Sequence, residues 1–175
     1  YNSYIAVAGN TAYFSGNDNI NGTELWKSDG TVAGTQMVKD IFPGNNSSSP
    51  YDFFAFKNKI YFAAVDGNSG YDNSFWTSDG TVAGTIKLAS IFPLQAYNLN
   101  ELSRQFCVSN NALYFAAFSY DYGNELWKTD GTVAGTVLVK DINPGYADAR
   151  PSYLTDVNGI LFFTADDGVN GNELW

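Results

Sequence analysis

DGTVAGT occupies residues 29–35 and occurs again, unchanged, at residues 79–85 and 130–136. A tryptophan stands three residues before each copy, and a fourth tryptophan follows the third copy without a further DGTVAGT. The four tryptophans are 50, 51 and 48 residues apart. They are Trp26, Trp76, Trp127 and Trp175. Self-similarity at a fixed period of this length is typical of repeat architectures, so the repeat decides the fold class.

Each repeat predicts four short antiparallel strands. The first ends in a pair of turn residues, such as Asn110-Asn111 or Asn158-Gly159, which suit the positive φ angles of a tight hairpin. The second is apolar on both faces, so both faces must be covered. The third carries the tryptophan, and the fourth follows the DGTVAGT loop. The first strands are expected at 3–8, 52–57, 104–109 and 152–157, and the fourth strands at 36–41, 86–91 and 137–142.

Four such strands in each repeat of about 50 residues predict an all-β fold, a β-propeller of four-stranded antiparallel blades. No window shows a helical period. A β-solenoid is the rival fold, although its coils are usually shorter and lack a hairpin turn at every strand junction. We expect a single repeat domain over 1–175 with blades near 1–42, 50–92, 102–143 and 151–175. The last is incomplete, so about 3.75 blades are expected, and further repeats or a second chain would close the ring.

Charge and composition exclude several functions. The chain has 18 acidic and 9 basic residues, which predicts repulsion of nucleic acid and of anionic membrane surfaces. No apolar run is long enough to insert into a bilayer. Because the chain has no histidine and a single cysteine in an apolar stretch, Cys107, His-based triads and metal centres are absent from it. We therefore expect a protein that is not an enzyme.

The pattern Glu-Leu-Trp-x-x-Asp-Gly-Thr-x-x-Gly-Thr at residues 24–35 and 125–136 resembles the bacterial ELWxxDGT repeat family. The Val-Lys-Asp-Ile runs at 38–41 and 139–142 extend the resemblance over nearly the whole chain. The second repeat departs from it, with Ser74 and Phe75 in place of Glu-Leu. The family implies large secreted or surface-attached bacterial proteins, hence an extracellular or cell-surface location, and no known catalytic residues.

The aspartates of the repeated loop are the first candidates for chemistry. Asp29, Asp79 and Asp130 could each act as a metal ligand or an acid. An aspartate before glycine at a hairpin is more often a turn former whose carboxylate accepts backbone N–H groups. A residue that recurs in every blade usually stabilises the blade and does not take part in a reaction. We therefore interpret these aspartates, with Trp26, Trp76, Trp127 and Trp175, as structural residues of the repeat.

Two loops before the third strands are rich in oxygen ligands. Residues 17–24 and 166–173 partly match the alternating Asp/Asn spacing of calcium loops, with glycine near the sixth position. A weak calcium site and an ordinary solvated turn both fit this pattern. The candidate ligands are Asp18, Asn19, Asn21, Asp166 and Asn170.

The connections after the second and fourth strands vary between repeats and lie on one face of the predicted ring. Variable loops on a rigid scaffold are where recognition usually occurs, and tyrosine offers both a stacking face and a hydroxyl. The candidate contacts are Tyr71, Tyr97, Tyr120, Tyr122, Tyr146 and Arg150.

The sequence as a whole favours a non-enzymatic repeat module that acts in adhesion, ligand binding or assembly through these loops. Its partner would be a protein or glycan on a cell surface, or a second copy of the chain. Two alternatives stay open: a carbohydrate-active propeller whose catalytic acids lie partly outside this segment, and an architectural spacer.

Overall fold

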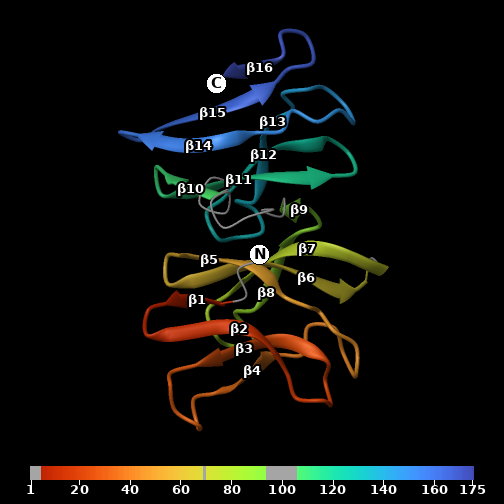
Figure 1. Ribbon diagram of the computed structural model, residues 1–175, viewed down its shortest axis with the longest axis vertical. Coiled ribbons are helices and arrows are strands. Elements are labelled where there is room, and N and C mark those ends of the chain that lie inside the picture. Colours follow the sequence, from red (N-terminus) through yellow and green to blue (C-terminus); the bar gives the residue numbers. More distant parts are fainter. Residues whose placement is uncertain (1–4, 69, 94–105) are drawn as a thin grey trace. The chain divides into compact units, whose positions relative to one another are not determined.

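The computed structural model describes residues 5–68, 70–93 and 106–175, with the backbone alone at 70–72 (Figure 1). Over these residues the regular structure consists of antiparallel β-strands, and no helix is present. The prediction of an all-β fold is confirmed. The sheets divide between two compact units, Asn2–Ser90 and Ile91–Trp175, which are described separately.

The first unit holds two four-stranded sheets, each with its strands in chain order. The first sheet consists of β1 (Ile5–Ala8), β2 (Thr11–Asn17), β3 (Thr23–Ser28) and β4 (Gln36–Lys39). The second sheet consists of β5 (Tyr51–Phe56), β6 (Lys59–Gly67), β7 (Gly70–Ser78) and β8 (Ile86–Ala89). In Figure 1 these strands run from red to yellow-green.

The second unit holds the third and fourth sheets. The third sheet consists of β10 (Phe106–Ser109), β11 (Ala112–Ser119), β12 (Gly123–Thr129) and β13 (Val137–Lys140). A short strand, β9 (Phe92–Pro93), also pairs with β11, so this sheet has five strands where the sequence predicts four. The fourth sheet consists of β14 (Ser152–Val157), β15 (Ile160–Asp166) and β16 (Asn172–Leu174).

The predicted hairpin turns at Asn110-Asn111 and Asn158-Gly159 are present. Lys57 and Asn58, like Asn110 and Asn111, have positive φ angles of 45–63°, as a two-residue hairpin turn requires. The expected first strand at 52–57 begins and ends one residue earlier, because Lys57 already belongs to the turn. Residues 3, 4, 104 and 105, the starts of two other expected first strands, lie outside the described part.

The core of the first unit lies between its two sheets. Leu25 and Val38 of the first sheet and Ile41, two residues after β4, share one buried cluster with Phe62 and Trp76 of the second sheet. Strand β6 is buried over seven consecutive residues, from Ile60 to Asp66, so both of its faces are covered. The sequence predicts that the second strand of each repeat is covered on both faces. In the second sheet, β6 is covered in this way.

The core of the second unit is built from equivalent positions. Leu126 of the third sheet and Ile142, two residues after β13, cluster with Leu154 and Ala165 of the fourth sheet, and Trp175 packs against them. In each unit a lysine at the end of the fourth strand lies over a tryptophan of the neighbouring sheet. Lys39 Nζ is 5.8 Å from the ring centroid of Trp76, and Lys140 Nζ is 4.4 Å from that of Trp175.

Candidate ligand-binding surface

The DGTVAGT loops satisfy their own polar groups. In the first loop, Asp29 Oδ1 accepts the backbone N–H of Thr31 at 2.9 Å and the Thr31 hydroxyl at 2.7 Å. The Thr31 Oγ1 in turn accepts the N–H of Gly34 at 2.9 Å, and Thr35 donates its hydroxyl to the Thr31 carbonyl. The same bonds recur around Asp79 and Asp130.

The hydrogen-bond network within each DGTVAGT loop explains why the three loops have identical residues. Gly34 lies against the Asp29 carboxylate, where a Cβ atom would collide with it. Hydrogen bonds from the threonine side chain and backbone lower the pKa of Asp29 and of Asp79. These carboxylates are accordingly bound by their own loops, as a turn-forming role requires.

The two candidate calcium loops also close on themselves. Asp18 Oδ1 accepts the N–H groups of Ile20 and Asn21 at 2.9 and 2.8 Å, and its Oδ2 accepts the Asn21 side-chain amide. Asp167, not Asp166, makes the equivalent three bonds, to Val169 and Asn170. The shared Asp-x-Ile/Val-Asn spacing could have identified Asp167 in the sequence.

The remaining calcium candidates have local roles as well. Asp166 accepts the N–H of Gly168 at 2.8 Å, and Asn19, with a φ of 63°, donates its N–H to the Asn17 side chain. Over the described residues, no group of three His, Cys, Asp or Glu side chains is placed to hold a metal ion. Calcium binding stays a prediction.

Two buried glutamates, which the sequence did not single out, anchor the loops that follow the fourth strands. The Glu24 carboxylate is fully buried and accepts the N–H of Ile41 at 2.8 Å and both the N–H and the hydroxyl of Ser48. Glu125 is also fully buried and accepts the N–H groups of Ile142 and Asn143 at 3.0 and 3.1 Å. Burial raises the pKa of both carboxyls, although the hydrogen bonds oppose the shift.

The second sheet lacks this anchor. Ser74 stands at the glutamate position, and its buried hydroxyl has no hydrogen-bond partner among the described residues. The loop that would correspond, residues 94–105, lies outside the described part. The candidate Tyr97 falls in that loop, and the side chain of the candidate Tyr71 is also outside the description.

In the second unit, the loop between β13 and β14 is fixed against β12. Asn124 donates its N–H to Asp148 Oδ1 at 3.0 Å, and its carbonyl accepts the N–H groups of Ala149 and Arg150 at 3.0 and 3.2 Å. Gly123, with a φ of 65°, lies so close to the Ala147 carbonyl that a side chain would collide. The β11–β12 turn and the β13–β14 loop are therefore joined by hydrogen bonds and together form one surface.

Four candidate side chains project from this surface, which we name the tyrosine surface: Tyr120, Tyr122, Tyr146 and Arg150. Tyr120 is 63% exposed while its ring packs edge-on against Phe92 and Phe118, each at a centroid distance of 5.6 Å. Tyr146 is 82% exposed, and Tyr122 is also exposed. The Arg150 Nε lies 3.8 Å from Asp148 Oδ2.

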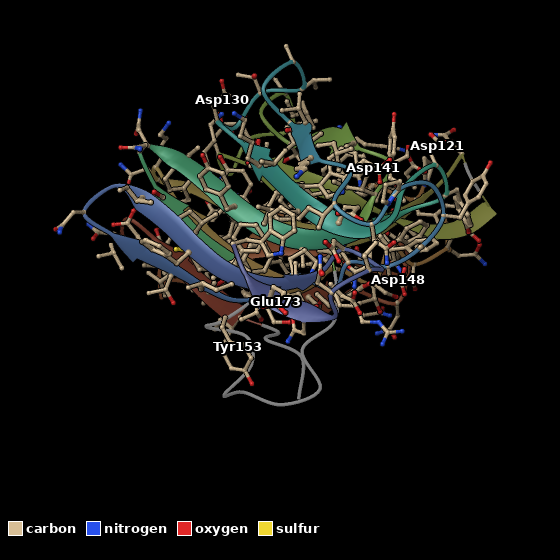
Figure 2. The ribbon with its side chains drawn as sticks, turned by 90° about the horizontal axis from the view of Figure 1, so that it is seen from above. Asp121, Asp130, Asp141, Asp148, Tyr153 and Glu173 are labelled. Atoms are coloured by element: carbon tan, nitrogen blue, oxygen red, sulfur yellow. The ribbon has the colours of Figure 1, made fainter. Side chains whose placement is uncertain are left out.

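The tyrosine surface also carries acidic groups. Figure 2 shows Asp121 and Asp148 on one side of the unit, away from the DGTVAGT loop that carries Asp130. Hydrogen-bonded loops, exposed aromatic rings and charged groups together suit the binding of a polar ligand with a flat apolar face.

Comparisons with known proteins add no function. The chain matches no protein-family model, and it matches no curated protein. No helix of the described segments is long and apolar enough to cross a membrane.

Proposed function

We propose that this chain is a non-enzymatic binding module of a secreted or surface-attached bacterial protein, and that its tyrosine surface binds neutral glycans in adhesion. The observation that carries the proposal is the exposure of Tyr120, Tyr122 and Tyr146 on loops that are held by backbone hydrogen bonds. An exposed aromatic ring leaves apolar surface in contact with water. A ligand that covers the ring removes this contact.

Preorganisation supports this proposal. A loop that is already ordered pays little conformational entropy when a ligand binds. The Asn124 hydrogen bonds and the buried Glu125 hold the β13–β14 loop at both of its ends. Tyr146 is therefore presented from a fixed backbone.

Charge favours an uncharged ligand over an anionic one. The chain carries a formal net charge of -9, and Asp121 and Asp148 accompany the tyrosines. An anionic polysaccharide would be repelled by this surface, since Arg150 is the one cationic group among the residues that define it. Neutral sugars offer hydroxyls to Asp148 and Arg150 and an apolar ring face to tyrosine.

We further propose that the four sheets are blades of a β-propeller. Two observations support this arrangement: each sheet runs through its strands in chain order, and in each unit two sheets share an apolar core. The resemblance to ELWxxDGT repeats supports the extracellular location.

A glycan array probed with the labelled protein, followed by calorimetric titration of the best ligand, tests the function. We expect a neutral oligosaccharide to bind without being cleaved, and Tyr120→Ala and Tyr146→Ala to weaken binding about tenfold each, or about 1.4 kcal/mol. Tyr153→Asn is the matched control, because Tyr153 is exposed on β14 and asparagine tolerates its φ of 57°. Cleavage of the glycan would instead identify an enzyme. If no glycan on the array bound, the chain would be a spacer.

A further inference from the structure

The loop between the second and third strands has the same length in the first and third sheets. In the first sheet the paired residues Asn17 and Thr23 enclose five residues. In the third sheet the paired residues Phe118 and Asn124 also enclose five. The last of the five is a glycine with a positive φ angle in both loops. The two loops are therefore equivalent position by position.

The first residue of each loop caps the turn in the same way. Asp18 Oδ1 accepts the N–H of Asn21 at 2.8 Å, and Ser119 Oγ accepts the N–H of Tyr122 at 3.1 Å. Both bonds join residues that are three apart, so the two backbones close the same turn. The side chains at the second, third and fourth loop positions can then differ while this turn is kept.

In the first unit, the loop between β4 and β5 is bound to β3. Thr23 donates its N–H to Ser47 Oγ at 2.9 Å, and its carbonyl accepts the N–H of Ser49 at 3.0 Å. Gly22 lies against the Asn46 carbonyl, where a Cβ atom would collide with it. These contacts repeat, position for position, those that join the β11–β12 turn to the β13–β14 loop in the second unit.

The two bound loops also follow the same path. Ser49 and Arg150 have φ angles of 45° and 51°. The carbonyl of the preceding residue accepts a backbone N–H of the next sheet, from Val65 at 2.9 Å and from Asp166 at 2.8 Å. We call this shared arrangement the display frame: the five-residue loop, the loop after the fourth strand and the hydrogen bonds that join them.

The side chains that the display frame presents differ between the two units. In the second unit they are those of the tyrosine surface together with Asp121 and Asp148, and they are aromatic or charged. In the first unit the side chains at the same six positions are uncharged, and none is aromatic. They are Asn19, Ile20, Asn21, Asn45, Ser47 and Ser49.

We propose, resting on the glycan-binding function proposed for the second unit, that the side chains at these six positions determine which ligand each unit binds. The display frame is the part of the site that both units share. The second unit binds a neutral glycan because its frame presents aromatic rings beside hydrogen-bonding charges. The first unit does not bind that glycan, since its frame offers no ring on which a sugar can stack.

An exchange of side chains between the two units tests this proposal. The first variant places the side chains of the first unit on the second, and these side chains already occur on such a frame. Titration calorimetry with the neutral oligosaccharide that the unaltered protein binds should show an affinity lower by about a hundredfold or more. The substitutions are Tyr120→Asn, Asp121→Ile, Tyr122→Asn, Tyr146→Asn, Asp148→Ser and Arg150→Ser.

The second variant adds the reverse exchange in the first unit. It also contains Asn17→Phe, because Phe118, at the equivalent position, is one of the rings against which Tyr120 packs. Binding should return to within about tenfold of the original affinity, with one site per chain. The added substitutions are Asn19→Tyr, Ile20→Asp, Asn21→Tyr, Asn45→Tyr, Ser47→Asp and Ser49→Arg.

Gly22→Ala in the second variant is the control for the frame. Its added Cβ atom would collide with the Asn46 carbonyl, and the φ of 72° disfavours alanine, so the regained binding should be lost again. The proposal is overturned if the first variant still binds, or if the second variant does not regain binding or does not fold. The proposed function stands in each of these cases, provided that the unaltered protein binds. If the unaltered protein binds no glycan, both proposals are overturned.

Discussion

The carboxylate of Glu24 accepts the backbone N–H of Ile41, 17 residues further along the chain, at 2.8 Å. Glu125 makes the same bond to Ile142 at 3.0 Å. A single buried side chain thus joins the third strand to the loop beyond the fourth, in both units. In the second unit that loop presents Tyr146.

Glu125→Ala should destabilise the second unit by about 2–4 kcal/mol, because it leaves the buried N–H of Ile142 and the partly buried N–H of Asn143 without acceptors. Asp121→Ala is the control, because the Asp121 side chain is exposed and a change below about 0.5 kcal/mol is expected. Urea denaturation compares the two. Equal effects would contradict the anchoring role of Glu125.

Asp52 predicts an unusual pH dependence. Its side chain is 1% exposed, neither oxygen has a hydrogen-bond partner among the described residues, and burial raises its pKa to about 6. The unfolded chain has the ordinary pKa of 3.8, so the folded state binds the proton more tightly. Stability should therefore decrease as the pH rises from about 4 to above 6, by at most about 3 kcal/mol.

Asp52→Asn removes this effect. Asparagine carries no charge and tolerates the φ of 54° at this position, so the variant should be more stable than the unaltered chain at pH 7.5. Free energies of unfolding measured between pH 4 and 8 provide the comparison. Glu24 and Glu125, whose pKa values are also raised, are present in both proteins and cancel in the difference. Parallel pH profiles for the two proteins would refute the assignment.

In the first DGTVAGT loop, the Asp29 side chain has a structural role, whereas the Val32 side chain has none. Asp29→Ala removes two hydrogen bonds to Thr31 and should lower the melting temperature measurably. Val32→Ala in the same loop should be neutral, because the Val32 side chain is almost wholly in solvent. Thermal unfolding of both variants checks this difference. A loss of stability for Val32→Ala that matches Asp29→Ala would contradict it.

Trp76 should be essential to the first unit. It is buried in the cluster that joins the two sheets, so Trp76→Ala should cost about 3–5 kcal/mol. Chemical denaturation followed by circular dichroism measures the loss. A cost below about 1 kcal/mol would show that the cluster does not depend on the indole.

The local features of this fold could be predicted from the sequence, because they depend on neighbouring residues. Asn110-Asn111 forms the predicted hairpin, and Asp29 makes the predicted bonds to its own loop. The buried role of Glu125 could not be predicted in this way. Glu24 and Glu125 accept hydrogen bonds from residues that lie 17 or more positions further along the chain, which neighbouring residues alone do not reveal.

In the candidate site, too, features that depend on neighbouring residues could be predicted and features that depend on distant residues could not. The exposed tyrosines could be named from loop composition, whereas the Asn124 bonds that fix their loops join residues about 25 apart and need the structure. Strand β9 was missed because two residues, Phe92 and Pro93, carry no alternating pattern of their own.

The most direct test of the proposed function is to map the backbone amides of the ¹⁵N-labelled protein by NMR during titration with a neutral oligosaccharide selected on the array. We expect chemical-shift changes concentrated in residues 119–124 and 145–150, and about tenfold weaker binding of the same oligosaccharide to Tyr146→Ala. Saturable changes concentrated in the DGTVAGT loops, or none at all, would contradict it.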